Sequence, residues 1–455
     1  MATLPPVRRR SARFRSSVAA RIDVREGDDG PELGHAASAI SPGSGSRSIP
    51  RPAPASESVP REIVAFDTGA FVGYRTACRF PPSRSGVTLF DSFTLGEIEL
   101  DNRIGLAPMT RVSATEGGRA TAAMARYYQK FADGGFGFVV TEGVYPDDAY
   151  GQGYLNQPGL ATAEQAESWE QVVDAVHDAG APIFAQLMHA GAQTQGNPHT
   201  DGETLGPSAV APKGEMAEAY GGSGEFATPK AATESELDAA REGFVAAAER
   251  ALDAGFDGVE IHGANGYLLN EFLSTYFNER DDEYGGAPEN RVRFPAEVVA
   301  AVDEATPEEF VVGIRVSQTA VSDDEYAWPE GEDAAAVFFE ELSAAGADYL
   351  HVTEGDATAP TFGDKTLAGA AAEYAVDGTV VIDNGGLGDP EAAGEKLDDG
   401  ADLVTLGTGA LANPDWPTRV REGKELAEFD PVEFLVPTAE HADHEVPAAD
   451  AASDD

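Results

Sequence analysis

Eight short apolar runs, most of them separated by a helix-like pattern, constrain the fold of this chain more than any other feature. The runs occupy residues 103–109, 136–143, 182–189, 256–263, 310–317, 348–355, 379–386 and 401–408. Amphipathic stretches that suit helices cover 120–133, 164–179, 234–254, 288–305, 332–345, 367–374, 390–399 and 413–427. Because short buried strands alternating with helices indicate parallel β/α units, this count predicts an α/β protein with a (β/α)8 TIM barrel.

Two additions to the barrel follow from the spacing of the runs. Residues 89–100 alternate in polarity around Gly96, which predicts a hairpin ahead of the first strand. Residues 190–233, after the third strand, are rich in Gly and Pro and predict an insertion that caps the face where the strands end. A doubly wound sheet is the competing fold, and eight successive units disfavour it.

The charge of the chain is strongly acidic and unevenly distributed. The formal net charge is −48; residues 1–85 hold 13 Arg against 8 Asp or Glu, whereas the rest holds 18 Lys or Arg against 71 Asp or Glu. Such a body repels phosphates, so we expect no nucleic-acid partner. An acidic, lysine-poor surface suits a protein that works in high salt, where ions screen self-repulsion, and we hypothesise that the protein is halophilic.

Two absences narrow the class of protein further. No stretch approaches 18 consecutive apolar residues, so we expect no membrane span. A single cysteine, Cys78, excludes a disulfide framework, a cysteine-ligated iron–sulfur cluster and a multi-cysteine zinc site. The histidines show no metal-ligand spacing, so we expect no metal.

The two ends of the chain differ in composition from its body. Residues 1–86 are basic and rich in Arg, Ser, Pro and Gly, and they form either a disordered tail or a segment that precedes the natural start. No apolar segment follows Arg8 to Arg15, so we reject an export signal and expect a cytoplasmic protein. The barrel is expected over 87–428, followed by an acidic tail over 429–455 that we expect to be disordered beyond about Glu440.

Polar and glycine residues gather where the predicted strands end, which in a barrel is the catalytic face. The richest example is the end of strand four, where His262, Asn265 and Tyr267 lie in a break marked by Gly263 and Gly266 before the chain restarts as a helix. A buried, satisfied histidine is the alternative for His262 alone. Three polar groups in one register at a strand end favour a functional site.

Five motifs on these strand ends and loops, taken in order, resemble one known family. They are Ala-Pro-Met-Thr-Arg at 107–111, Gln-Leu-Met-His-Ala-Gly at 186–191, His-Gly-Ala-Asn-Gly-Tyr-Leu-Leu-Asn-Glu-Phe-Leu-Ser at 262–274, Arg-Asp-Asp-Glu-Tyr-Gly-Gly at 280–286 with Glu-Asn-Arg at 289–291, and Ala-Asn-Pro-Asp at 412–415. Each motif is weak alone. Together they make residues 89–427 similar to the Old Yellow Enzyme family of flavin-dependent ene-reductases, which implies an FMN-binding barrel.

The resemblance implies a set of FMN contacts. The set comprises Gln186 at the pyrimidine edge, Arg315 beside N1 and O2, Thr110 at O4, and the backbone of Pro108, Met109 and Gly143 along the ring. A polar pair that merely fills the upper layer of the barrel is the alternative for Gln186 and Arg315. His189 is predicted to contact the flavin or to support a residue that does, and His351 to pack in the core.

One position departs from the family pattern at the expected phosphate site. The phosphate should lie where strands seven and eight end, against Gly385, Gly386, Gly407 and Thr408. The family usually carries Arg at the position of Thr408. A threonine hydroxyl gives one neutral hydrogen bond in place of a charged fork, so we expect weaker FMN affinity or compensation by salt cations.

The same resemblance implies the chemistry. His262 and Asn265 would bind the carbonyl or nitro oxygen of an activated alkene, and Tyr267 would protonate its α-carbon. NADH or NADPH would reduce FMN, whose N5 would pass hydride to enones, enals or nitroalkenes. An FMN-dependent amine dehydrogenase or demethylase, and a non-catalytic flavin-binding protein, remain alternatives. A homo-oligomer also stays open, because no aromatic contribution from the C-terminus to an active site is recognisable.

Overall fold

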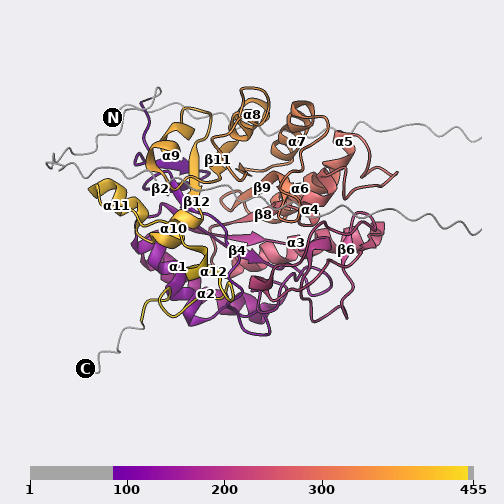
Figure 1. Ribbon diagram of the computed structural model, residues 1–455, viewed down its shortest axis with the longest axis horizontal. Helices are drawn as coiled ribbons and strands as arrows, with labels where there is room; N and C mark the ends of the chain where they lie inside the picture. The colour runs from indigo at the N-terminus through magenta and orange to yellow at the C-terminus, as the bar shows by residue number, and fades with distance from the viewer. Residues whose placement is uncertain (1–85, 449–455) are drawn as a thin grey trace, which may run out of the picture. The chain divides into compact units, whose positions relative to one another are not determined.

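Eight parallel strands close into a barrel in the computed structural model, which describes residues 86–448 (Figure 1). The barrel strands are β3 (Ile104–Leu106), β4 (Phe138–Val144), β5 (Ile183–Leu187), β8 (Gly258–Asn265), β9 (Val311–Ala320), β10 (Tyr349–Thr353), β11 (Val380–Asn384) and β12 (Leu403–Leu406). Each pairs in parallel with the next, and β12 pairs with β3 to close the ring. The predicted TIM barrel and all eight strands are confirmed. The predictions for residues 1–85 lie outside the described residues.

Helices follow the strands on the outside of the barrel. They are α1 (Ala122–Asp133), α2 (Ala163–Asp178), α3 (Glu234–Asp253), α4 (Leu268–Leu273), α5 (Pro288–Arg291), α6 (Arg293–Ala305), α7 (Glu332–Ala344), α8 (Leu367–Tyr374), α9 (Pro390–Lys396), α10 (Thr408–Ala412) and α11 (Trp416–Glu422). The single helix predicted over 288–305 is two, because Pro295 has no N–H to donate back and lies in the first turn of a new helix. No helix within residues 86–448 is long and apolar enough to cross a bilayer.

A hairpin plugs the end of the barrel where the strands begin. β1 (Phe93–Leu95) and β2 (Ile98–Leu100) pair antiparallel, as predicted, around Gly96 in the left-handed conformation. Leu95 and Leu100 are fully buried against residues near the start of the barrel strands: Phe138, Phe184, Val311, Tyr349 and Leu403. This apolar plug leaves the opposite end of the barrel as the one available for chemistry.

The insertion after β5 caps that opposite end, as predicted. It contains two short 3-10 turns, η1 (Gly191–Gln193) and η2 (Glu218–Tyr220), and a parallel pair of two-residue strands, β6 (Leu205–Gly206) and β7 (Lys230–Ala231). Gln195, Tyr220 and Phe226 from this insertion line the cavity described below. Backbone hydrogen bonds tie the insertion to the loop after β4, where the Gln195 and Gly196 N–H groups both donate to the Gly153 carbonyl.

The C-terminal segment, defined here as residues 429–448, corrects one prediction. We expected disorder beyond about Glu440, yet the segment forms α12 (Pro431–Leu435) and then runs along α1. Arg126 and Lys130 of α1 donate to the Pro447 and Glu445 carbonyls at 2.8 and 2.7 Å. The prediction is wrong for residues 441–448, because acidic composition does not reveal that one carboxylate of this segment pairs with a buried cation. Residues 449–455 lie outside the described residues.

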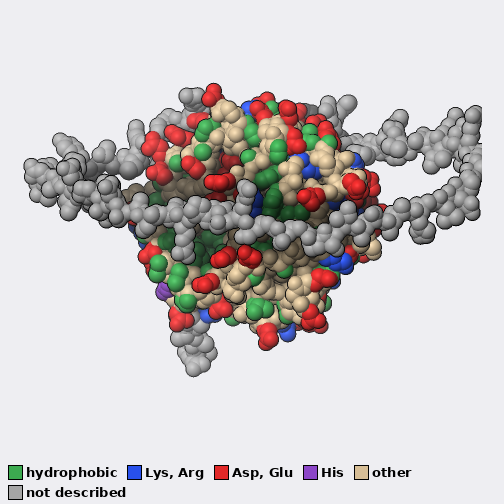
Figure 2. Space-filling model, turned by 45° about the vertical axis from the view of Figure 1, so that its right-hand side comes forward, with side chains coloured by type: hydrophobic (Ala, Val, Ile, Leu, Met, Phe, Trp, Pro, Cys, Tyr) green, Lys and Arg blue, Asp and Glu red, His purple; other side chains and the backbone are tan. Residues whose placement is uncertain are grey.

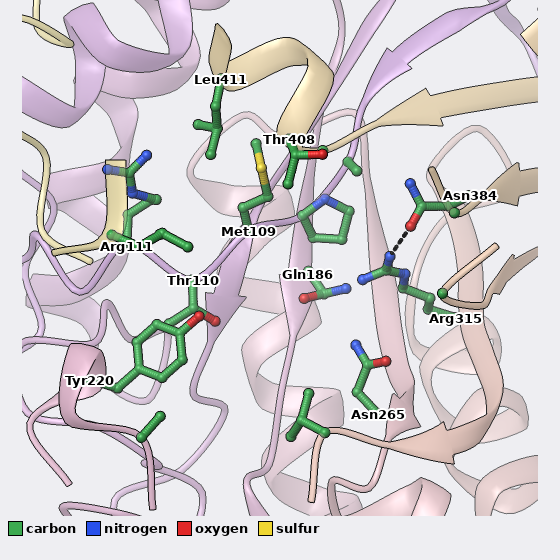
Figure 3. Close-up of a pocket in the computed structure, with 18 of the residues that line it drawn as sticks. Met109, Thr110, Arg111, Gln186, Tyr220, Asn265, Arg315, Asn384, Thr408 and Leu411 are labelled. Atoms are coloured by element: carbon green, nitrogen blue, oxygen red, sulfur yellow. Dashed lines mark hydrogen bonds between the residues drawn. The ribbon is translucent and has the colours of Figure 1, made fainter. Parts of the chain in front are cut away.

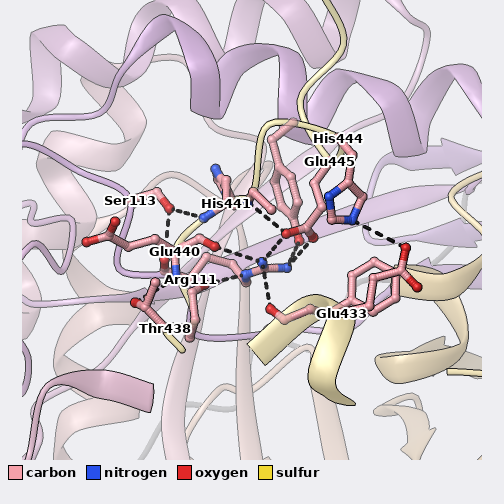
Figure 4. A network of polar contacts seen from close by, with 12 residues as sticks. Arg111, Ser113, Glu433, Thr438, Glu440, His441, His444 and Glu445 are labelled. Atoms are coloured by element: carbon pink, nitrogen blue, oxygen red, sulfur yellow. Dashed lines mark hydrogen bonds and ion pairs between the residues drawn. The ribbon is translucent and has the colours of Figure 1, made fainter. Parts of the chain in front are cut away.

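That cation is Arg111, which follows the end of β3 and is 1% exposed. Its guanidinium donates to both Glu445 carboxylate oxygens at 2.7 and 2.6 Å and to the Ala439 carbonyl at 2.8 Å (Figure 4). The His441 ring stacks on Tyr127 with 3.8 Å between ring centroids. A bidentate ion pair removed from water therefore fixes the C-terminal segment to the strand that begins the barrel.

We expect Glu445→Gln to destabilise the protein by about 3 kcal/mol, because it leaves a buried guanidinium without its counter-charge. The matched control is Glu433→Gln on the same segment. Glu433 is exposed and lies 3.6 Å from His444, so its loss should change the free energy of unfolding by less than about 0.5 kcal/mol. Urea unfolding of the full chain measures both. Equal losses in the two variants would contradict the role given to Arg111.

Candidate active site

A cavity of about 520 Å³ opens where the barrel strands end (Figure 3). It gathers side chains from positions far apart in the chain. All the residues predicted for the site line it except Gly143, namely Pro108, Met109, Thr110, Gln186, His262, Asn265, Tyr267, Arg315, Gly385, Gly386, Gly407 and Thr408. Their convergence follows from the barrel, in which every strand delivers its last residues to one rim.

Gly143 and His189 do not reach the cavity wall. The Gly143 carbonyl accepts a hydrogen bond from Gln157 Nε2 at 2.8 Å, and a side chain at this glycine would collide with Met188 Sδ at 2.6 Å. His189 Nδ1 accepts from the Gly191 N–H at 3.2 Å, and the ring is buried. His189 thus lies in a supporting position, and contact of the Gly143 backbone with a flavin stays a prediction.

His262 presents a neutral imidazole to the cavity. Burial, reinforced by the charge of Arg315, lowers the pKa of His262 to about 3, so the ring is uncharged at neutral pH. Its Nδ1 accepts from the Ala264 N–H at 3.2 Å. The proton of the neutral ring therefore lies on Nε2, which makes that nitrogen a hydrogen-bond donor.

Two left-handed residues turn the chain from β8 into α4 and shape the site. Asn265 has φ +63° and Gly266 has φ +84°, conformations that Asn tolerates and Gly favours. The turn is held by the Asn265 N–H, which donates to Ser317 Oγ at 2.7 Å, and by Gln193 Nε2, which donates to the Asn265 carbonyl at 2.7 Å. The Asn265 side-chain amide is left to face the cavity (Figure 3).

Tyr267 is coupled to a second tyrosine that sequence reasoning missed. The hydroxyls of Tyr267 and Tyr154 lie 2.6 Å apart, and both rings are buried. Burial raises the pKa of both phenols, so each is protonated at neutral pH and one donates to the other. Tyr154 lies in an irregular loop after β4, and nothing in its local sequence marks it.

A charged group and an amide occupy the part of the cavity beside β5 and β9. Arg315 Nη2 donates to Asn384 Oδ1 at 2.7 Å and to Thr353 Oγ1 at 3.1 Å, while its buried Nε has no hydrogen-bond partner. Gln186 Nε2 donates to Glu260 Oε1 at 2.8 Å. Unused polar capacity on buried groups at a cavity wall indicates a polar ligand.

Glycines bring bare backbone to the rim at β11 and β12. Gly385 has φ +147°, and a side chain there would lie 2.3 Å from the Glu354 carbonyl oxygen. Gly407 follows β12 and precedes α10. Gly409 packs so closely on Gly388 that an added Cβ would lie 3.1 Å from the Gly388 Cα. Backbone N–H groups freed in this way can approach an anion.

The C-terminal segment also contributes to the cavity, which the sequence did not reveal. Phe429 and Leu435 line it. The ring of Phe429 stacks on Phe434 at 5.5 Å between centroids. An aromatic contribution from the C-terminus, which we could not recognise in the sequence, is therefore present within the same chain.

Comparison with known proteins places this arrangement in a family. The model of the NADH:flavin oxidoreductase / NADH oxidase family matches residues 88–427. The chain belongs to this family. It is 36% identical over 362 residues to a protein of Leishmania infantum named "Probable flavin mononucleotide-dependent alkene reductase", covering 77% of this chain and 95% of that one. The predicted resemblance to Old Yellow Enzymes is confirmed.

Solved structures of family members agree with the fold. The old yellow enzyme homologue from Zymomonas mobilis superposes with a TM-score of 0.69 at 30% identity, covering 80% of this chain and all of that one (100%). Morphinone reductase in complex with tetrahydroNAD gives a TM-score of 0.68 at 34% identity, covering 81% and 99% of the two chains. These similarities support the barrel fold. The role of each side chain has to be argued from the geometry of the cavity.

The residues around the cavity fit the FMN of this flavin oxidoreductase family. The unpartnered Arg315 Nε and the Gln186 amide could supply polar contacts for a flavin pyrimidine edge, and Arg315 could supply a cation for the anionic reduced ring. The glycine-lined rim of Gly385, Gly386 and Gly407 is open enough for a phosphate. The cavity wall thus offers hydrogen-bonding groups and a cation for the pyrimidine, and backbone N–H groups for the phosphate.

The phosphate portion lacks a cation. Arg111 and Arg315 are the arginines among the cavity-lining residues described, and no lysine lines the cavity. Arg111 is already paired with Glu445, and Arg315 is held by Asn384. The anion is left with backbone N–H groups and the Thr408 hydroxyl, which is the departure from the family pattern that the sequence predicted.

We expect Thr408→Arg to strengthen FMN binding by about tenfold, because a charged hydrogen bond to phosphate replaces a neutral one. Titration of apo-protein with FMN, followed by quenching of flavin fluorescence, measures the dissociation constant. Riboflavin, which has no phosphate, is the control ligand and should bind both proteins equally. Thr408→Ser retains the hydroxyl and should match the wild type. A gain for riboflavin as large as that for FMN would contradict a phosphate contact at this position.

Proposed function

We propose that this protein is an FMN-dependent NAD(P)H oxidoreductase that reduces activated C=C bonds of enones, enals and nitroalkenes. The observation that carries the proposal is the convergence of a neutral His262, the Asn265 amide and a protonated Tyr267 on a cavity that also fits a flavin. The name of the Leishmania infantum relative and the tetrahydroNAD complex of morphinone reductase support it.

FMN, when bound, supplies hydride taken from NADH or NADPH. The chain's own contribution begins with substrate binding. His262 Nε2–H and the Asn265 amide, which both face the cavity, donate to the carbonyl or nitro oxygen of the alkene. Two donors on one oxygen withdraw electron density from the conjugated double bond, so its β-carbon accepts hydride more readily. Because His262 is neutral, this polarisation costs no buried charge.

Tyr267 completes the reaction by giving a proton to the α-carbon. Its phenol is protonated at neutral pH, as a general acid must be. Tyr154 lies 2.6 Å away and donates to the Tyr267 oxygen as the proton leaves, which stabilises the phenolate that forms. Tyr267 thus holds the proton that is transferred, and Tyr154 holds a second proton that can replace it.

Apolar side chains from outside the barrel shield this chemistry from water. Phe226 comes from the insertion, and Phe429 and Leu435 come from the C-terminal segment. Exclusion of water strengthens the hydrogen bonds to the substrate oxygen. These three residues come from segments outside the barrel strands. Their side chains are placed to determine which alkenes fit.

We expect Tyr267→Phe to slow alkene reduction by roughly 10²–10⁴-fold, because the general acid is lost. Reduction of the flavin by NAD(P)H should stay close to the wild-type rate, since that step needs no proton from Tyr267. Stopped-flow absorbance of the two half-reactions separates these rates. Equal losses in both, or turnover of N-methylated amines in place of enones, would contradict the proposal.

We further propose that the protein works in high salt in the cytoplasm, where NAD(P)H is available. Acidic side chains are spread over the face of the molecule in Figure 2, and Lys and Arg are far fewer. Self-repulsion of these carboxylates is screened by ions. We expect helical circular dichroism and enone reduction to rise together as KCl is raised from none to molar concentrations. Full folding and activity without added salt would contradict the halophilic assignment.

A further inference from the structure

A series of polar contacts, most of them buried, runs through the barrel beneath the cavity. It begins at Gln186 on β5 and passes through Glu260 on β8 and His351 on β10 to Thr405 on β12. From there the Thr405 carbonyl accepts from Asn384 Nδ2 at 3.0 Å, and Asn384 holds Arg315. This series of contacts therefore connects Gln186 with Arg315, the two side chains assigned to the flavin pyrimidine.

Glu260 is the hub of this network and is completely buried (0% exposed). Its Oε1 accepts from Gln186 Nε2 at 2.8 Å. Its Oε2 faces His351 Nδ1 at 2.6 Å and accepts from the Tyr349 hydroxyl at 3.2 Å. The Tyr349 ring fits only because residue 313 is glycine, since a Cβ there would lie 2.1 Å from the ring.

The charge state of the network follows from its contacts. Burial opposes ionisation of Glu260, but the hydrogen bond from His351 and the charge of Arg315 outweigh it and hold the pKa of the carboxyl below its usual value. Burial lowers the pKa of His351. An ionised Glu260 beside a neutral His351 requires that Nδ1–H donates to the carboxylate and that Nε2 accepts from the Thr405 hydroxyl, 2.8 Å away.

An ionised carboxylate can only accept, and this fixes the orientation of Gln186. Its amide nitrogen must face Glu260. The amide oxygen and the second N–H of Gln186 are then left for the cavity as an acceptor beside a donor. The edge of a flavin pyrimidine offers the complement, an N–H donor beside a carbonyl acceptor, so the orientation that Glu260 imposes is the one that pairs with it.

We propose that Glu260, supported by His351 and Thr405, is a positioning residue for FMN that sets both its affinity and its reduction potential. Glu260 fixes the amide of Gln186, and its negative charge offsets the positive charge of Arg315 beneath the pyrimidine. The inference rests on the proposed function, because it concerns the same flavin. It goes further by assigning a role to a carboxylate that touches neither substrate nor cofactor.

Two substitutions separate geometry from charge. Glu260→Asp keeps the charge but withdraws the carboxylate from Gln186, so the FMN dissociation constant should rise by about tenfold while the potential stays near that of the wild type. Glu260→Gln keeps an acceptor but removes the charge, so Arg315 is no longer offset and the reduced, anionic flavin is favoured. Its potential should therefore shift in the positive direction.

The matched control is Glu297→Gln on α6, outside the barrel. Glu297 is partly buried and accepts from the Tyr284 hydroxyl at 3.1 Å, so it tests a Glu-to-Gln change that has no connection to the cavity. Its affinity for FMN and its potential should equal those of the wild type. FMN titration of apo-protein gives the affinity, and spectroscopic equilibration of the holoenzyme with a reference dye gives the potential.

Each variant can overturn the inference by itself, so failure of one to fold leaves the other decisive. Wild-type affinity in Glu260→Asp, or a wild-type potential in Glu260→Gln, would overturn it, as would loss of folding stability without change in either flavin property. If a variant gave one of these results while the enzyme still bound FMN and reduced enones, the inference about Glu260 would fail and the proposed function would stand. A wild-type protein that fails to bind FMN would instead overturn the proposed function.

Discussion

The pairing of β12 with β3 is the constraint on which the rest of this structure depends. It converts eight parallel strands into a ring, so that residues separated by up to three hundred positions meet at one rim. The hairpin of β1 and β2 fills the other end with apolar side chains, which leaves polar groups a single outlet. Any glycine, amide or imidazole at the end of a barrel strand therefore lies at the same rim, beside the same cavity.

Charge is arranged differently along the two sides of that cavity. The substrate side holds groups that burial keeps uncharged, a neutral His262 and two protonated phenols. The other side holds two buried charged groups, with Arg315 at the wall and Glu260 beneath it. Neutral donors can polarise an oxygen without attracting ions, whereas an offset cation can stabilise a reduced flavin, so each side matches the charge of the group that we propose it contacts.

The sequence predicted well whatever depends on neighbours in the chain. His262, Asn265 and Tyr267 lie within six positions, and the glycine between them marks the turn, so their grouping could be read directly. Strand and helix periods depend equally on near neighbours, and the barrel followed from counting them. The one break we missed in a helix, before Pro295, is also local and could have been inferred from the missing N–H.

Residues placed by distant contacts could not be predicted in this way. Tyr154 is defined by its contact with Tyr267, 113 positions away, and Glu445 by Arg111, 334 positions away. Glu445 is chemically identical to the exposed acidic residues around it in the sequence, so composition pointed to disorder. Gly143 lies at a strand end, as predicted, but it does not line the cavity, and a side chain there would collide with Met188.

The attachment of Glu445 to Arg111 has a consequence for the order of assembly. A chain emerges from the ribosome with its N-terminus first, so the arginine is made more than three hundred residues before its counter-ion. Throughout that interval the nascent protein carries an unmatched guanidinium next to Thr110, and Phe429 and Leu435 have not yet been added to the cavity wall. The full cavity wall and its support are therefore in place only after residues through Glu445 have been synthesised.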